Sequence, residues 1–91
     1  MGEPLFVGPH GRPLVILGER VLTLADAKAR YIQLRAQIRR DDLRGGSEPR
    51  HRQAVRQLGE ALAHHYGCTP YDIQIRFRLE VAKACQALMA T

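Results

Sequence analysis

The 91-residue sequence has no run of about 18 uncharged apolar residues, so we expect no membrane-spanning helix. It also lacks a basic segment followed by an apolar one near its start, which is the pattern of a secretory signal. Its sixth residue is not the serine or threonine that the myristoylation pattern requires. We therefore expect a cytoplasmic protein without a membrane anchor. The length predicts a single small domain, 1–91, with a thin core that buries roughly 60% of the unfolded surface.

Cysteine, histidine and acidic residues are too few and too scattered for a catalytic or metal centre. His64, His65, Cys68 and Cys85 offer nitrogen and sulfur atoms, but no Cys-x-x-Cys pair occurs, and adjacent histidines on a helix point about 100° apart. Two cysteines in a reducing compartment are more typical of small buried side chains. Gly45-Gly46 is not followed by the lysine of a phosphate-binding loop. We expect no enzymatic activity, metal, cofactor or small-molecule substrate.

Lysine is scarce as well. Lys28 and Lys83 are the two lysines among the 14 basic residues, and all the others are arginines. An arginine side chain binds phosphate or carboxylate through two parallel hydrogen bonds, so this preference indicates an anionic partner. A GC-rich gene would produce the same preference without any function, and that explanation stays open.

The basic residues are concentrated in one segment, 28–56, which carries nine of them against three acidic residues. The remainder of the chain carries five against six. Because clustered charge raises the local potential, we expect a polyanionic partner: nucleic acid, directly or within a nucleoprotein complex, or an acidic protein face. A solvated helical surface would explain the same segment without a partner. The residues expected to bind the polyanion are Lys28, Arg35, Arg39, Arg40, Arg44, Arg50, Arg52 and Arg56.

The apolar pattern predicts a mainly α domain of the α+β class. Short aliphatic runs broken by glycine and proline over 5–22 predict a β-hairpin, with a loop at Gly8-Pro9-His10-Gly11. A three-helix unit is expected to follow, with helices over 24–43, 48–66 and 70–89. The hairpin must pack on these helices or add to the sheet edge of a partner, because an isolated hairpin is only marginally stable.

Local signals place the ends of the first two helices. Thr23 is expected to cap the first helix, and Ser47 to cap the second. Gly67 is expected to end the second helix in a left-handed turn. Gly59, inside that helix, costs about 1 kcal/mol relative to alanine, which suggests the close approach of another backbone. The apolar seams of the two helices are Leu24, Ala27, Tyr31, Leu34 and Ile38, and Val55, Leu58, Leu62 and Tyr66.

The last segment, 70–89, carries two competing patterns. Its start, Thr-Pro-Tyr-Asp, is typical of a capped helix, whereas the apolar residues of 72–81 alternate with polar ones as in a strand. The cap and the helical pattern after residue 81 favour a helix, and a strand over 72–81 is the alternative. A continuous helix would be apolar on two sides. We therefore expect Ile75 and Leu79 to contact a partner protein or the second subunit of a homodimer.

The junction between the second and third predicted helices, 62–73, is similar to the core of a helix-turn-helix. Two helices that cross steeply need a small residue at the contact, a glycine in the turn and an aliphatic residue that locks the second helix. The residues that match are Ala63, Gly67, Cys68 and Ile73. Arg76 departs from the pattern, which normally buries an aliphatic side chain there, and Phe77 is its nearest substitute.

The resemblance implies that Tyr71, Gln74 and Arg78 face the major groove of DNA, with glutamine toward adenine and arginine toward guanine. Residues 70–91 carry a net charge of only +1, so the basic segment and the predicted reading helix do not coincide in the sequence. The sequence predicts a small, non-enzymatic nucleic-acid-binding module with helix-turn-helix-like second and third helices. The alternative is a protein–protein adaptor, small subunit or inhibitor that docks through the hairpin edge and the last helix.

Overall fold

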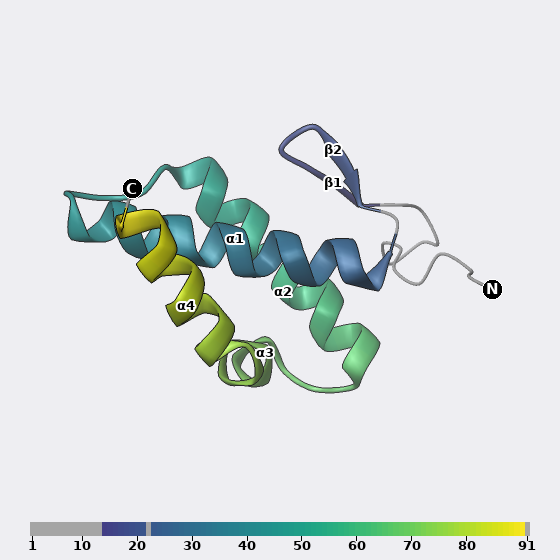
Figure 1. Cartoon of the computed structure of the whole chain (residues 1–91). Helices are drawn as coiled ribbons and strands as arrows, with labels where there is room; N and C mark the ends of the chain where they lie inside the picture. The colour runs from purple at the N-terminus through teal and green to yellow at the C-terminus, as the bar shows by residue number, and fades with distance from the viewer. Residues whose placement is uncertain (1–13, 22, 91) are drawn as a thin grey trace.

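The computed structural model of the chain describes residues 14–21 and 23–90. The described elements are β1 (Leu14–Ile16), β2 (Glu19–Val21), α1 (Leu24–Leu43), α2 (Pro49–Tyr66), α3 (Pro70–Arg76) and α4 (Arg78–Met89). The strands pair antiparallel, α2 returns along α1 in the opposite direction, and α4 packs against α1 (Figure 1). The predicted mainly α, α+β fold with an N-terminal hairpin followed by helices is confirmed.

The hairpin turns at Leu17 and Gly18. Both residues have positive φ, 52° and 83°, as a tight two-residue turn between antiparallel strands requires. Ile16 and Val21 are buried, and β1 packs against α2. The helices therefore supply the packing that a two-stranded sheet lacks by itself. The loop predicted at 8–11 lies outside the described residues.

α1 begins and ends where the sequence predicts. The side-chain oxygen of Thr23 accepts a hydrogen bond from the backbone N–H of Asp26 at 3.0 Å, which caps the helix. At the other end, the backbone N–H of Gly46 donates to the carbonyl of Asp41 at 2.9 Å. The helix ends at Leu43 with Arg44 as its C-cap, and Gly46 follows with φ 139°, a conformation that favours glycine.

The cap predicted for the second helix is wrong by one residue. α2 begins at Pro49, its N-cap is Glu48, and the Glu48 side chain makes no capping hydrogen bond. Proline favours the first helical position, which leaves Ser47 outside the helix. The Ser47 hydroxyl instead accepts a hydrogen bond from Nε of Arg52 at 2.6 Å. The end of α2 is as predicted, because Gly67 adopts the left-handed conformation with φ 70°.

The segment 70–89 is helical, so the strand alternative is wrong, but it forms two helices rather than one. Phe77, with φ −106° and ψ 16°, interrupts the helix between α3 and α4. α3 packs against α2 while α4 packs against α1, and one straight helix could not follow both. Phe77 joins Ile73 in the core as a result, and Ile75 and Leu79 on the other apolar side stay exposed.

Tyr31 is a buried residue of the core, only 2% exposed. Its ring centroid is 6.0 Å from that of Phe77, and the two rings are tilted by 56°. The largest fully buried side chains are Tyr31, Ile16, Leu58, Leu62 and Ile73. The predicted seams of α1 and α2 therefore face the core, with Leu24, Ile38 and Tyr66 partly buried at its edge.

Gly59 faces the side chain of Tyr31 and not another backbone, so the close backbone approach suggested by the sequence is wrong. A Cβ atom added at Gly59 would lie 3.5 Å from Cε1 of Tyr31, which is an ordinary van der Waals contact. We therefore expect Gly59→Ala to raise the free energy of unfolding by up to about 1 kcal/mol, because alanine restricts the unfolded chain. Urea denaturation followed by circular dichroism measures this, and a lower midpoint at unchanged m-value would contradict it.

Candidate anion-binding groove

A groove lies between α1, α2 and the junction of α3 with α4. Its volume is about 540 Å³, and it adjoins a hollow of about 280 Å³ with which it shares Tyr31, Arg35, Ile38, Arg52 and Gln74. We call the two together the arginine groove. Its charged lining residues are Arg35, Arg39, Arg52, Arg56 and Arg78, with Asp42 and Glu60.

Helical spacing brings the arginines to the groove from three directions. Arg35 and Arg39 are four residues apart on α1, and Arg52 and Arg56 are four apart on α2, so each pair shares one helix face. Arg78 is the first residue of α4. Five arginines against two carboxylates make the lining strongly basic.

Four of these arginines have no carboxylate partner. Within residues 14–21 and 23–90, no ion pair involves Arg35, Arg39, Arg56 or Arg78. Arg56 precedes Glu60 by four residues on α2, yet the two are not paired. The four guanidinium groups therefore have no carboxylate acceptor among the described residues.

Arg52 has a structural role that the other groove arginines lack. Its Nη2 atom lies 2.8 Å from Oδ1 of Asp42, at the end of α1. Its Nε atom donates to the hydroxyl of Ser47 in the connection that follows. Arg52 thus connects the start of α2 to the end of α1. Its ion pair with Asp42 also neutralises one of the two carboxylates that line the groove.

The groove separates the eight residues expected to bind a polyanion into two groups of four. Those that line it are Arg35, Arg39, Arg52 and Arg56. Those elsewhere on the surface are Lys28, Arg40, Arg44 and Arg50. Arg40 pairs with Asp41, and Arg50 pairs with Glu48, each at 3.1 Å. Lys28 lies on α1 with Arg35 and Arg39 but does not line the groove.

The three residues that the helix-turn-helix resemblance directed toward DNA bases lie in the same groove. Tyr71, Gln74 and Arg78 line it from the side of α3 and α4, and Arg35 and Arg39 line it from α1. The basic segment and the predicted reading residues, separate in the sequence, therefore meet in space. This juxtaposition results from the packing of α4 against α1.

Four residues between α2 and α3 match the helix-turn-helix pattern in the sequence, and Cys68 among them is partly buried. Ala63 and Ile73 are buried, and Gly67 adopts a left-handed conformation in the turn. Arg76 is exposed, and Phe77 is buried in its place. The buried position that follows Ile73 is therefore Phe77, one residue later than the pattern expects.

Tyr31 is the buried aromatic residue that lines both parts of the groove. Burial raises the pKa of Tyr31 above its ordinary value of 10.0, and the positive charge of Arg35 lowers it in part. The phenol is therefore neutral at pH 7, and Tyr31 adds no negative charge to the lining. The sequence identified Tyr31 as a core residue but carried no signal that it also lines a groove.

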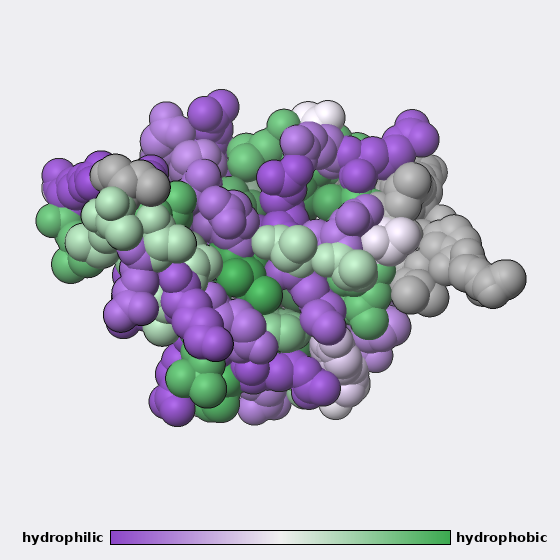
Figure 2. Space-filling view, viewed as in Figure 1, coloured by the Kyte–Doolittle hydropathy of each residue, from purple (hydrophilic) through white to green (hydrophobic). Residues whose placement is uncertain are grey.

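An apolar surface lies at the α3–α4 end of the molecule. Ile75 and Leu79 are 51% and 71% exposed, and Ile75 also lines the groove. Figure 2 shows an isolated hydrophobic patch there, surrounded by hydrophilic side chains. The expected partner-contact residues are therefore available on the surface.

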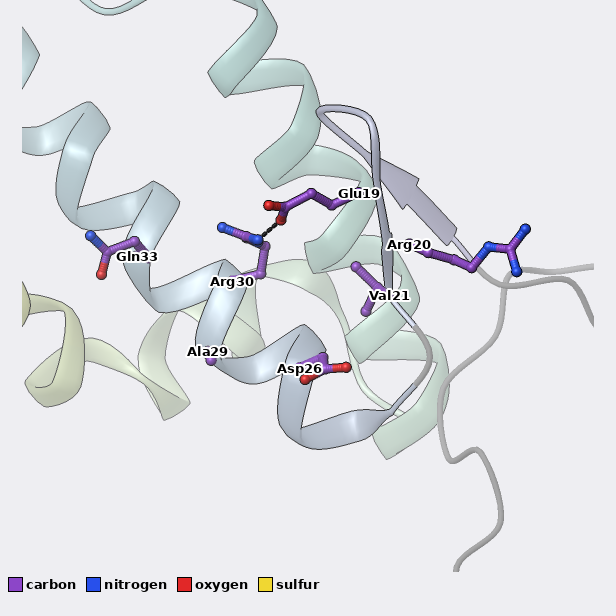
Figure 3. A pocket seen from close by; sticks show the side chains of 7 residues that line it. All are labelled: Glu19, Arg20, Val21, Asp26, Ala29, Arg30 and Gln33. Atoms are coloured by element: carbon purple, nitrogen blue, oxygen red, sulfur yellow. Dashed lines mark ion pairs between the residues drawn. The ribbon is translucent and has the colours of Figure 1, made fainter.

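A second pocket, between β2 and α1, differs from the arginine groove in the balance of charged residues that line it (Figure 3). Glu19 and Arg30 point toward each other and form an ion pair across it. Arg20 and Asp26 also line it, so its two arginines are balanced by two carboxylates. This pocket therefore offers a polyanion no excess of positive charge.

No described helix is long and apolar enough to cross a membrane. The described ranges also hold no group of three or more histidine, cysteine, aspartate or glutamate side chains that could bind a metal ion. Cys68 and Cys85 are both free thiols. Comparison of the chain with protein-family models, with curated proteins and with solved structures gave no match.

Proposed function

We propose that this protein is a non-enzymatic module that binds nucleic acid in the arginine groove. The observation that carries the proposal is a set of four arginines around one groove that have no carboxylate partner among the described residues: Arg35, Arg39, Arg56 and Arg78. Guanidinium groups bind phosphate oxygens through paired hydrogen bonds. A chain of phosphates would satisfy several of these groups together, which a single small anion would not.

A cytoplasmic location is part of the same proposal. The free thiols of Cys68 and Cys85 fit a reducing compartment. Nucleic acid is abundant there, and the net charge of +5 favours encounter with it.

A protein–protein adaptor is the second candidate function. It is favoured by the exposure of Ile75 and Leu79 beside the groove, since exposed apolar side chains of neighbouring turns are typical of interaction sites. In this case Ile75 and Leu79 would make the apolar contact with the partner protein, and the groove arginines around them would bind its acidic residues. The two candidates differ in the anion that they require, phosphate or carboxylate.

The test measures binding of the whole chain to labelled random-sequence single-stranded DNA, duplex DNA and RNA by fluorescence anisotropy. For four phosphate contacts, we expect affinity to fall by roughly 50- to 150-fold between about 50 and 200 mM salt. Polyglutamate serves as the competitor with carboxylates in place of phosphates, and light scattering gives the mass of the protein.

Steeply salt-dependent binding that polyglutamate displaces poorly would support the proposal. Absence of binding to all three nucleic acids at about 50 mM salt would contradict it. Displacement by polyglutamate at the same charge concentration would favour the adaptor, as would the mass of a dimer without nucleic-acid binding.

A further inference from the structure

Tyr71 is the one described tyrosine or phenylalanine whose side chain is mainly exposed, at 67%. It lies at the edge of the arginine groove, and Tyr31 and Phe77 are by contrast buried in the core. An exposed aromatic ring beside unpaired arginines is the combination with which proteins bind single-stranded nucleic acid, because bases stack on the ring while phosphates follow the positive charge.

The start of α3 holds Tyr71 in place. The side chain of Thr69 accepts from the backbone N–H of Asp72, and the Asp72 side chain accepts from the backbone N–H of Thr69, each at 3.1 Å. Pro70 restricts the backbone further at the first helical position. The backbone of Tyr71 is thus ordered before a ligand binds, which lowers the entropy lost on stacking.

The shape of the site favours a single strand over a duplex. An element that reads duplex DNA must project into a major groove about 12 Å wide. Tyr71, Gln74 and Arg78 instead line a concave groove together with residues of α1 and α2. A flexible strand can enter this groove with its bases exposed, whereas a duplex presents a convex backbone and keeps its bases stacked inside.

We propose that the arginine groove binds single-stranded nucleic acid with an unpaired base stacked on Tyr71, an inference that rests on the function proposed above. Arg35 and Arg39 follow one another by about 6 Å along α1, a spacing that suits successive phosphates of an extended strand. Gln74, exposed on α3, presents an amide that can hydrogen-bond to a base edge. The strand is thus held by phosphate contacts on α1 and by base contacts on α3.

The test compares three labelled probes of equal length, about 12 nucleotides: oligothymidine, the same strand built with abasic sugars, and a duplex. Each is titrated by anisotropy with the wild type, Tyr71→Ala, Tyr71→Phe and Leu79→Ala. Leu79 is the matched control, because it is as exposed as Tyr71 but does not line the groove. Circular dichroism verifies that each variant is folded.

We expect Tyr71→Ala to weaken oligothymidine binding by roughly 5- to 150-fold and to leave abasic binding unchanged, since only stacking is lost. Tyr71→Phe and Leu79→Ala should bind like the wild type. Equal wild-type affinity for the abasic and base-bearing strands, or tighter binding of the duplex, would overturn this inference and leave the nucleic-acid proposal intact. Absence of binding to all three probes would contradict the proposed function itself.

Discussion

Replacing Arg35, Arg39 and Arg56 together by glutamine is expected to weaken nucleic-acid binding by roughly 100-fold or more at about 0.1 M salt. Each of these arginines lines the groove and has no carboxylate partner among the described residues. Each lost phosphate contact removes one released counterion, so the slope of log affinity against log salt should become shallower by about 2 to 3. Anisotropy titrations over a series of salt concentrations measure both quantities.

The control removes the same amount of charge elsewhere. Arg20, Arg76 and Lys83 are exposed and do not line the groove, so replacing all three by glutamine lowers the net charge equally. If the binding site is the groove, the slope of log affinity against log salt for this control variant should stay close to that of the wild type. If the two triple variants lose nucleic-acid affinity equally, binding depends on overall charge, and the groove is not the binding site.

Arg52 is left out of the first variant because its substitution would mix binding with stability. It bonds to both Asp42 and Ser47 across the connection between α1 and α2. Arg35, Arg39 and Arg56 make no ion pair within the described part of the chain, so their replacement should change the free energy of unfolding by no more than about 0.5 kcal/mol. An unchanged thermal midpoint for the triple variant would show that its loss of affinity is not unfolding.

Phe77→Ala is expected to produce the largest loss of stability among the variants described above. Phe77 is 5% exposed, lies against Tyr31 and occupies the joint at which α3 ends and α4 begins. Truncation of a buried phenylalanine costs about 3–5 kcal/mol, because apolar contacts are lost and a cavity remains. For a domain of this size that corresponds to a decrease in Tm of roughly 12 to 40 °C.

Urea denaturation followed by circular dichroism measures this loss. Leu79→Ala is the control, because Leu79 is 71% exposed two residues further along and its truncation should change stability by at most about 0.5 kcal/mol. If Phe77→Ala does not fold, Phe77→Leu should, because leucine keeps most of the buried apolar volume and therefore loses less stability than alanine does. Equal stability of the Phe77 and Leu79 variants would mean that Phe77 is not part of the core.

The chain's local signals predicted most of its elements. Thr23 caps α1, and Gly67 ends α2 in a left-handed conformation, because capping hydrogen bonds and positive φ angles depend on a few neighbouring residues. The prediction of the α2 cap at Ser47 is wrong by one residue, and the N-cap is Glu48. A serine and a proline two positions apart give competing signals for one helix start.

The break at Phe77 could not be read from the sequence. The alternating apolar pattern of 72–81 was compatible with a strand or with a helix that is apolar on two sides. Which of these forms depends on what the segment packs against, and α3 and α4 pack against two different helices. The local sequence contains no information about the directions of α1 and α2.

The sequence by itself determined α1 and α2, their apolar seams, and the concentration of arginines in 28–56. Only the tertiary structure decided which arginines face a common groove and that Tyr71, Gln74 and Arg78 lie there with them. Helix caps and periodicity act over a few residues, whereas Arg35 and Tyr71 come together because the apolar faces of α1, α2 and α4 must be buried against one another. The site is thus a product of core packing.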